Sequence, residues 1–418
     1  MDKLLIKGKK ELFGSILISG SKNATLPILA ATLLANEVKL SNVPLVKDIF
    51  TMLELLKFIG IKVKINKNDK SIELKNNKNI KTLAPYKLVK TMRAGVLVLG
   101  PLLTKYKKAK VSLPGGCAIG TRPVDLHLFA LKKLGAKIKI KDGYIIAEAK
   151  KGLRGNKIKF PSISVGATEN ALLAASGASG KTILLNCAIE PEILDLIFFL
   201  KKLGCKIDIQ GRRIIIEKKK KVKDKVNHNI IFDRIEAGTY LIAGALIGKK
   251  IILKDIKPQI LKCEINTLKK MGAKITLSKN SVSIFKSNKL KRINILTKPY
   301  PGFPTDLQAQ LMVLMCKAVS KSSITESIFE NRFMHVAELQ RLGAKINIMN
   351  NTATIEGNTK FIGAELMSSD LRASVALVLA AIVSTGKSYI NRIYHLDRGY
   401  EKIENKLKKI GVKIKRLK

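Results

Sequence analysis

The segment with the clearest chemical potential is a loop that carries a cysteine. Residues 112–127 read Ser-Leu-Pro-Gly-Gly-Cys-Ala-Ile-Gly-Thr-Arg-Pro-Val-Asp-Leu-His, and their three glycines and two prolines predict a loop. Cys117 lies five residues before Arg122 and ten before His127. Nearby cationic groups lower the pKa of a thiol from about 8.5, so that it can exchange a proton or attack an electrophile near neutral pH. We expect Cys117 to be reactive, the alternative being an inert loop cysteine.

The other cysteines are expected to be small buried side chains, because they lie in apolar helices or strands. They are Cys187, Cys205, Cys263 and Cys316. Five is an odd number and no CxxC pair occurs, so the sequence indicates neither a disulfide framework nor a zinc site. No metal and no cofactor are expected.

A second set of polar residues lies at the predicted starts of six apolar helices. Free N–H groups and a partial positive charge at a helix start suit phosphates and carboxylates. Helix capping is an alternative explanation for Thr168, Asp306 and Asp370. The cations of the set oppose the helix dipole unless an anion lies beside them. The set comprises Lys22 and Asn23, Arg93, Thr168 and Glu169, Glu236, Asp306, and Asp370 with Arg372.

Arginine usage supports anion recognition. The chain has 65 lysines but only 13 arginines, and seven arginines fall at these helix starts or in adjoining loops. A planar guanidinium binds carboxylate or phosphate at two points, which lysine cannot do. Some of the seven are expected to form structural ion pairs instead. They are Arg93, Arg122, Arg234, Arg332, Arg372, Arg392 and Arg398.

A sixfold repeat sets the architecture that positions these residues. The phrase Leu-Lys-Lys-Leu-Gly-Ala-Lys-Ile at 131–138 recurs with variations, centred on glycines 68 to 75 residues apart. In each copy an amphipathic helix ends at a glycine, which can adopt a left-handed conformation, and an alternating strand follows. The glycines are Gly60, Gly135, Gly204, Gly272, Gly343 and Gly411.

Each repeat also contains a helix that is apolar on every face, as core helices are. A repeat therefore reads as buried helix, strand, amphipathic helix and strand hairpin, with helices inside and sheets outside. Six repeats suit an α/β protein of two domains. The lysine-rich stretch 218–225 is predicted to be the crossover, and a ligand is expected between the domains. The apolar helices are predicted at 23–35, 92–103, 167–177, 237–247, 307–319 and 371–384.

Composition narrows the class of protein. The chain has 418 residues, is 46% hydrophobic and carries a net charge of +47. Its longest apolar runs are shorter than the roughly 20 residues that span a bilayer, and its first residues meet charge too early for a signal peptide. We expect a cytoplasmic enzyme that does not bind membranes. The lysines are evenly spread, which favours anionic small-molecule substrates over nucleic acid.

With these features assembled, the sequence resembles the enolpyruvyl transferases along its whole length, specifically those that act on UDP-N-acetylglucosamine in peptidoglycan synthesis. The resemblance implies an inside-out α/β barrel in each of two domains, at 1–21 plus 231–418 and at 22–230. It also implies addition and elimination with phosphoenolpyruvate, without a metal and without a required oligomer. The motifs lie at 19–24, 90–94, 112–127, 164–168, 233–236, 303–306, 330–335, 370–374 and 394–400.

The resemblance also implies roles for individual residues. Cys117 would protonate C3 of phosphoenolpyruvate and react with the antibiotic fosfomycin, and Asp306 would accept the proton of the sugar hydroxyl. Lys22, Arg122 and Arg398 would hold phosphate and carboxylate. The nucleotide sugar would contact Asn23, Arg93, Arg122, Pro123, Val124, Asp125, Leu126, Ser162, Ile163, Ser164, Val165, Asp306 and Ile328.

Two positions depart from the family pattern, and two other functions remain open. Ser162 and Ile189 stand where some members have Lys and Arg, which predicts at most weaker binding of the nucleotide. A shikimate 3-phosphate enolpyruvyl transferase would share the fold, but a cysteine-bearing loop argues against it. An RNA-binding protein would suit the charge, but the chain has no Trp and no basic segment interleaved with aromatic residues.

Overall fold

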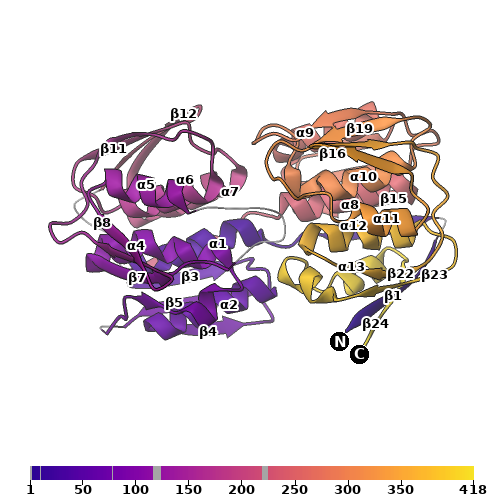
Figure 1. The fold of residues 1–418 in the computed structure, drawn as a ribbon. Helices are drawn as coiled ribbons and strands as arrows, with labels where there is room; N and C mark the ends of the chain where they lie inside the picture. Colours follow the sequence, from indigo (N-terminus) through magenta and orange to yellow (C-terminus); the bar gives the residue numbers. More distant parts are fainter. Residues whose placement is uncertain (1, 10, 78, 116–123, 219–224) are drawn as a thin grey trace. The chain divides into compact units, whose positions relative to one another are not determined.

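The computed structural model describes residues 2–9, 11–77, 79–115, 124–218 and 225–418. They divide into two compact units, which we call the first unit (described residues of 2–19 and 232–418) and the second unit (described residues of 20–115 and 124–231). Each unit contains three repeats, and every repeat forms one four-stranded sheet (Figure 1).

The second unit holds the first three repeats. In each sheet a parallel pair of strands is followed by an antiparallel hairpin. The strands, in sheet order, are β14 (Lys225–Asn229), β3 (Glu37–Ser41), β5 (Ser71–Asn76) and β4 (Ile61–Asn66); β6 (Leu83–Ala84), β7 (Lys108–Ser112), β9 (Tyr144–Glu148) and β8 (Lys137–Lys141); and β10 (Lys157–Lys159), β11 (Lys181–Leu185), β13 (Arg213–Glu217) and β12 (Lys206–Gln210). The helices are α1 (Lys22–Ala31), η1 (Thr32–Leu34), α2 (Lys47–Ile59), α3 (Tyr86–Val89), η2 (Arg93–Val98), α4 (Leu99–Tyr106), α5 (Asp125–Lys133), α6 (Val165–Ala175) and α7 (Pro191–Leu203).

The first unit repeats this plan, except that in its last sheet the two ends of the chain, 3–7 and 413–417, form the antiparallel pair in place of a hairpin. Its sheets are β2 (Leu12–Leu17), β15 (Gly248–Lys254), β17 (Ser281–Phe285) and β16 (Lys274–Ser278); β18 (Asn294–Leu296), β19 (Ser322–Thr325), β21 (Thr352–Ile355) and β20 (Ile346–Met349); and β22 (Glu365–Met367), β23 (Lys387–Asn391), β1 (Lys3–Lys7) and β24 (Lys413–Leu417). The helices are α8 (Arg234–Ile247), η3 (Pro258–Leu261), α9 (Lys262–Lys270), η4 (Thr305–Leu307), α10 (Gln308–Cys316), α11 (Val336–Arg341), α12 (Leu371–Ile382), η5 (Ile393–Arg398) and α13 (Ile403–Lys409).

The apolar helices form the core of each unit, and the sheets lie on the outside (Figure 1). All nine residues of α10 are buried, as are eleven of the twelve residues of α12. Burial on every side explains why these segments lack a polar face. The six repeat glycines have φ between +95° and +122°, so each ends its amphipathic helix in a conformation that side chains with a Cβ rarely adopt.

The short parallel strands were not predicted, and two of them pair with strands that are distant in the sequence. β2 precedes α1 in the sequence but pairs with β15 of the first unit, and β14 precedes α8 but pairs with β3 of the second unit. The chain therefore passes between units after β14, at residues 231–232. The crossover predicted at 218–225 was placed too early, because the pairing of β14 cannot be seen in the local sequence.

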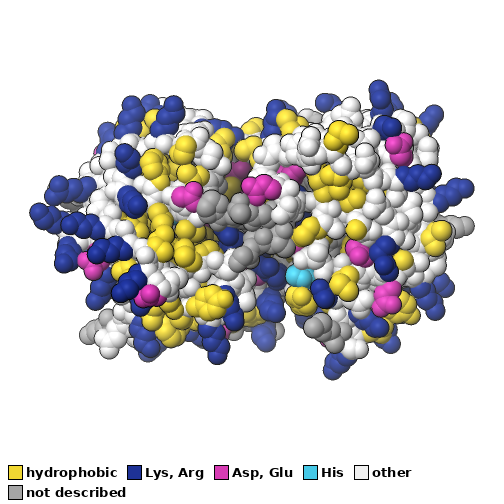
Figure 2. All heavy atoms as spheres, viewed as in Figure 1, with side chains coloured by type: hydrophobic (Ala, Val, Ile, Leu, Met, Phe, Trp, Pro, Cys, Tyr) yellow, Lys and Arg dark blue, Asp and Glu magenta, His cyan; other side chains and the backbone are white. Residues whose placement is uncertain are grey.

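Basic side chains are distributed over the surface rather than gathered in one stripe, as Figure 2 shows for one face. Lys residues alternate with buried apolar residues along many strands, for example in Lys413–Leu417, where Lys413 and Lys415 are exposed and Ile414 is buried. Exposed lysines on the strands thus contribute to the net charge of +47.

Candidate active site

The central feature of the first unit is a carboxylate held between two arginines. One oxygen of Asp306 accepts a hydrogen bond from Arg332 Nη2 at 2.6 Å, and the other accepts one from Arg372 Nη2 at 2.8 Å. Both guanidiniums are almost completely buried, whereas the Asp306 side chain is 27% exposed. The carboxylate is thus rigidly oriented while one part of it stays open to an incoming group.

Three different elements supply this triad. Asp306 lies in η4, Arg332 lies in the loop before α11, and Arg372 lies in the first turn of α12. Asp370 caps α12 by accepting hydrogen bonds from the backbone N–H groups of Arg372 and Ala373. The cap explanation therefore holds for Asp370, but Asp306 instead binds two arginines.

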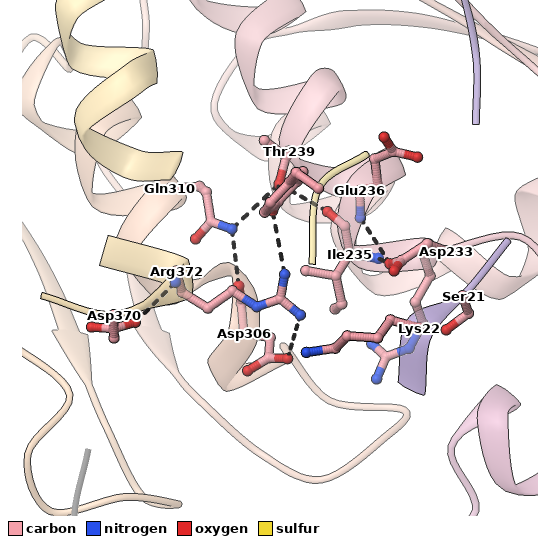
Figure 3. A network of polar contacts seen from close by, with 12 residues as sticks. Ser21, Lys22, Asp233, Ile235, Glu236, Thr239, Asp306, Gln310, Asp370 and Arg372 are labelled. Carbon is pink, nitrogen blue, oxygen red and sulfur yellow. Dashed lines mark hydrogen bonds and ion pairs between the residues drawn. The ribbon is translucent and has the colours of Figure 1, made fainter. Parts of the chain in front are cut away.

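A buried polar network supports Arg372 from behind (Figure 3). Its Nη1 donates to the Tyr400 hydroxyl at 3.4 Å, and Tyr400 contacts the Thr239 hydroxyl at 2.8 Å. Gln310 donates to Thr239 and to the backbone carbonyl of Asp306. Burial is the largest influence and favours neutral Arg372, but Asp306, Tyr400 and Asp233 together raise its pKa above the ordinary value. Arg372 therefore remains a fixed cation.

The charges at helix starts are partly explained by internal ion pairs. Arg372 has Asp306 as its anion, and Lys22 at the start of α1 lies 3.2 Å from Asp48. For Lys22 and Arg372 the anion beside the helix start is therefore a side chain of the protein, so the helix dipole alone does not indicate a bound ligand there. Glu236 also has partners within the protein, since its carboxylate accepts hydrogen bonds from Lys406 Nζ and from the backbone N–H of Ser19.

His127 lies in the first turn of α5, beside the predicted contact residues Asp125 and Leu126. Its ring contacts Asn170 Nδ2 at 3.2 Å and packs against Gly166 in the first turn of α6. Packing around the imidazole and the charge of Arg93 lower the pKa of His127 to about 4, so it is neutral at pH 7. His127 thereby links the start of α5 to α6, and several of the predicted nucleotide-sugar contacts lie at the starts of these two helices.

The remaining predicted residues occupy a range of surroundings. Ser164 caps α6, Val124 is buried, and Asp125, Ser162 and Val165 are exposed. Asn23, Leu126, Ile163, Ile328 and Arg398 are half-buried, and Arg398 ends η5, two residues before Tyr400. Cys117, Arg122 and Pro123 lie outside the described residues.

Arg332, Arg372 and His127 were not among the predicted site residues. The sequence placed both arginines among those of the helix starts and loops, and it placed His127 at the end of the cysteine loop. Arg372 lies in the first turn of an apolar helix, which was the available signal for it, whereas Arg332 and His127 lie outside the six apolar helices. Their shared contacts depend on three-dimensional packing.

Glu169 is a buried acid in α6 that no ion pair in the described part of the chain includes. Burial, together with the charges of Glu192 and Glu190, raises the pKa of Glu169 well above its ordinary value of 4.5. The folded protein thus binds this proton more tightly than the unfolded chain does. Its stabilising effect is complete below pH 4.5 and is lost as the pH rises through the folded-state pKa.

Replacing Glu169 by Gln is therefore expected to raise the free energy of unfolding at pH 7. The gain is about 1.4 kcal/mol for each unit by which the pKa of Glu169 in the folded protein exceeds its pKa in the unfolded chain, counted up to pH 7. Urea denaturation at pH 5, 6, 7 and 8 measures it. Glu148→Gln, at an exposed position, should change stability by less than about 0.5 kcal/mol. A Glu169→Gln protein that is less stable than the wild type at pH 7 would show that the folded protein stabilises the charged carboxylate and not the protonated one.

Among the described residues, no group of three His, Cys, Asp or Glu side chains could hold a metal ion. No helix in that part of the chain is both long and apolar enough to cross a membrane.

Comparison with known proteins matches the whole chain. The family model described as EPSP synthase (3-phosphoshikimate 1-carboxyvinyltransferase) matches residues 6–407. The chain is 62% identical to the UDP-N-acetylglucosamine 1-carboxyvinyltransferase of Pelagibacter ubique, with 100% of both chains covered. It is 49% identical to the enzyme of that name from Helicobacter pylori, again with 100% of both covered.

Solved structures show the same fold at low sequence identity. The enolpyruvyl transferase NikO from Streptomyces tendae superposes with a TM-score of 0.90 at 22% identity, covering 99% of this chain and 98% of its own. EPSP synthase from Acinetobacter baumannii gives 0.77 at 17% identity, with 100% of both covered. These likenesses confirm the predicted fold class.

Proposed function

Because the chain belongs to the EPSP synthase family, and within it to the UDP-N-acetylglucosamine 1-carboxyvinyltransferases, we propose that it transfers enolpyruvyl from phosphoenolpyruvate to UDP-N-acetylglucosamine. The 3-hydroxyl of the sugar is the acceptor, and inorganic phosphate is released. The observation that carries this proposal is 62% identity over the full length of a relative of that name. The reaction would be the first committed step of peptidoglycan synthesis, and so part of cell wall biogenesis, cell shape and cell division, in the cytoplasm.

The proposed reaction has two stages. In the addition, the sugar oxygen bonds to C2 of phosphoenolpyruvate, C3 gains a proton, and the hydroxyl loses its own proton. In the elimination, C3 gives up a proton, the bond between C2 and the phosphate oxygen breaks, and the double bond re-forms. Protons and electrons balance without a metal or a redox cofactor, so residues that move protons and stabilise charge suffice.

Asp306 is proposed as the proton acceptor for the sugar hydroxyl. Its partly exposed carboxylate, fixed by Arg332 and Arg372, supports this role, because a general base must be both accessible and well oriented. The two cations also favour the ionised carboxylate, which is the form that accepts a proton.

Cys117 is proposed as the acid that protonates C3 and as the target of fosfomycin. Lys22, Arg122 and Arg398 would hold the phosphate and carboxylate of phosphoenolpyruvate. Closure of the cysteine loop would expel water during the reaction. The nucleotide sugar would contact the residues from Asn23 to Ile328 that the resemblance implies, several of which lie at the starts of α5 and α6. Ser162 and Ile189, which depart from the family pattern, would at most weaken the binding of the nucleotide.

Phosphate release tests the proposal. Phosphoenolpyruvate with UDP-N-acetylglucosamine should yield phosphate at a rate that chelation of divalent metals leaves unchanged, and phosphoenolpyruvate with shikimate 3-phosphate should not. Phosphate release with shikimate 3-phosphate alone would assign the other family activity. Neither reaction, together with base-selective RNA binding at physiological salt, would reject enzymatic transfer.

A further inference from the structure

Glu326 is a buried carboxylate that connects two separate segments of the first unit. It lies directly after β19 and is 3% exposed. Its Oε1 accepts hydrogen bonds from the Thr297 hydroxyl at 2.9 Å, from Ile328 N–H at 2.8 Å and from Phe329 N–H at 3.3 Å. Its Oε2 accepts one from the Thr305 hydroxyl at 2.8 Å. All four donors are neutral, and no basic side chain in the described part of the chain forms an ion pair with Glu326.

The two segments that Glu326 connects both lead to the arginine-bound carboxylate. Thr305 directly precedes Asp306 in η4. On the other side, the backbone runs from Phe329 to Arg332, whose guanidinium lies 5.5 Å from the centre of the Phe329 ring and binds Asp306. The two segments are therefore joined at two places, by the hydrogen bonds of Glu326 and by the ion pair between Asp306 and Arg332.

The position of Glu326 is itself fixed by its backbone. Its N–H donates to the carbonyl of Asn351 at 2.8 Å, and Asn351 Nδ2 donates to the Glu326 carbonyl at 3.1 Å. Thr297 is fully buried and accepts from Ser327 N–H at 2.9 Å. A carboxylate anchored in this way has little freedom to move, so it holds both segments in a constant relative position.

We propose that Glu326 is a positioning residue that sets the location of Asp306 relative to the Ile328 backbone. The inference rests on the proposed function, in which Asp306 takes the proton of the sugar and Ile328 contacts the nucleotide sugar. Holding both by one side chain aligns the acceptor hydroxyl with its base. A misplacement of about 1 Å in such an alignment can cost on the order of 100-fold in rate.

Kinetic constants of four variants test this inference. Glu326→Ala removes all four hydrogen bonds, and it should lower kcat on the order of 100-fold and raise KM for UDP-N-acetylglucosamine. Thr305→Val removes only the link toward Asp306, so kcat should fall about 10-fold while this KM stays within about twofold. Glu326→Gln should recover most of the rate, because its oxygen can accept from both N–H groups and its amide can donate to Thr305.

Thr325→Val is the matched control. This residue precedes Glu326, and its hydroxyl contacts Thr352 at 2.8 Å, away from Asp306. Its kcat should equal that of the wild type. A merely structural role would lower the melting temperature of the other variants without changing kcat per folded molecule.

The outcomes separate the two proposals. An inactive wild-type protein would overturn the proposed function and this inference with it. An active wild type with Thr305→Val and Glu326→Ala within twofold of Thr325→Val would overturn the inference alone. If Glu326→Ala does not fold, Thr305→Val and Glu326→Gln still decide.

Discussion

Replacing Asp306 by Asn is expected to lower kcat for phosphate release by about 10²- to 10⁴-fold, the range found when a positioned general base is lost. The amide has nearly the shape of the carboxylate, but it cannot take a proton from the sugar hydroxyl. It also turns an N–H group toward one of the two buried guanidiniums, Arg332 or Arg372, where an oxygen now accepts. Single-turnover phosphate release at saturating concentrations of both substrates measures the chemical step.

The free energy of unfolding of Asp306→Asn shows how much of its effect comes from the loss of a buried ion pair and not from the loss of a catalytic base. Breaking a buried ion pair costs about 3–5 kcal/mol, and the partial exposure of Asp306 reduces that cost. Glu264→Gln is the control, since Glu264 is a buried carboxylate 3.6 Å from Arg234 in the same unit. It should lose stability while keeping kcat. A kcat for Asp306→Asn within threefold of the wild type would exclude Asp306 as the base.

The repeat architecture could be predicted because its signals are local. Helix-ending glycines such as Gly60 and Gly411 and helices that are apolar all round can be recognised within short windows, and both are confirmed. The two-residue strand β6 is too short to show a periodic pattern. The pairing of β2 with β15 and of β14 with β3 joins residues more than 180 positions apart, which no local pattern reports.

The site was only partly predictable for a related reason. The resemblance identified Asp306, but the helix-dipole argument considered each helix alone and so left Lys22 and Arg372 without anions. Their partners, Asp48 and Asp306, come from other elements of the same unit. Charge balance at a buried helix start is a tertiary property, because the counter-ion can come from any element that packs there.

Replacing Cys117 by Ser is expected to abolish labelling by fosfomycin and to lower kcat by about 10²- to 10⁴-fold. A hydroxyl is a far weaker acid than a thiol, so it neither protonates C3 efficiently nor forms the nucleophilic anion at neutral pH. Intact-mass measurement after incubation with fosfomycin should show one adduct on the wild-type chain and none on Cys117→Ser.

The other cysteines provide the control, because burial makes each of them a poor nucleophile. It raises the pKa of Cys187 and Cys316 to about 12 and that of Cys205 to about 11, and it also raises the pKa of Cys263. At pH 7 a thiol with a pKa of 11 is ionised in only about one molecule in 10⁴. Cys205→Ser should therefore keep the full adduct and the full rate. An adduct that persists in Cys117→Ser would assign the reactive thiol elsewhere and remove Cys117 from the proposed chemistry.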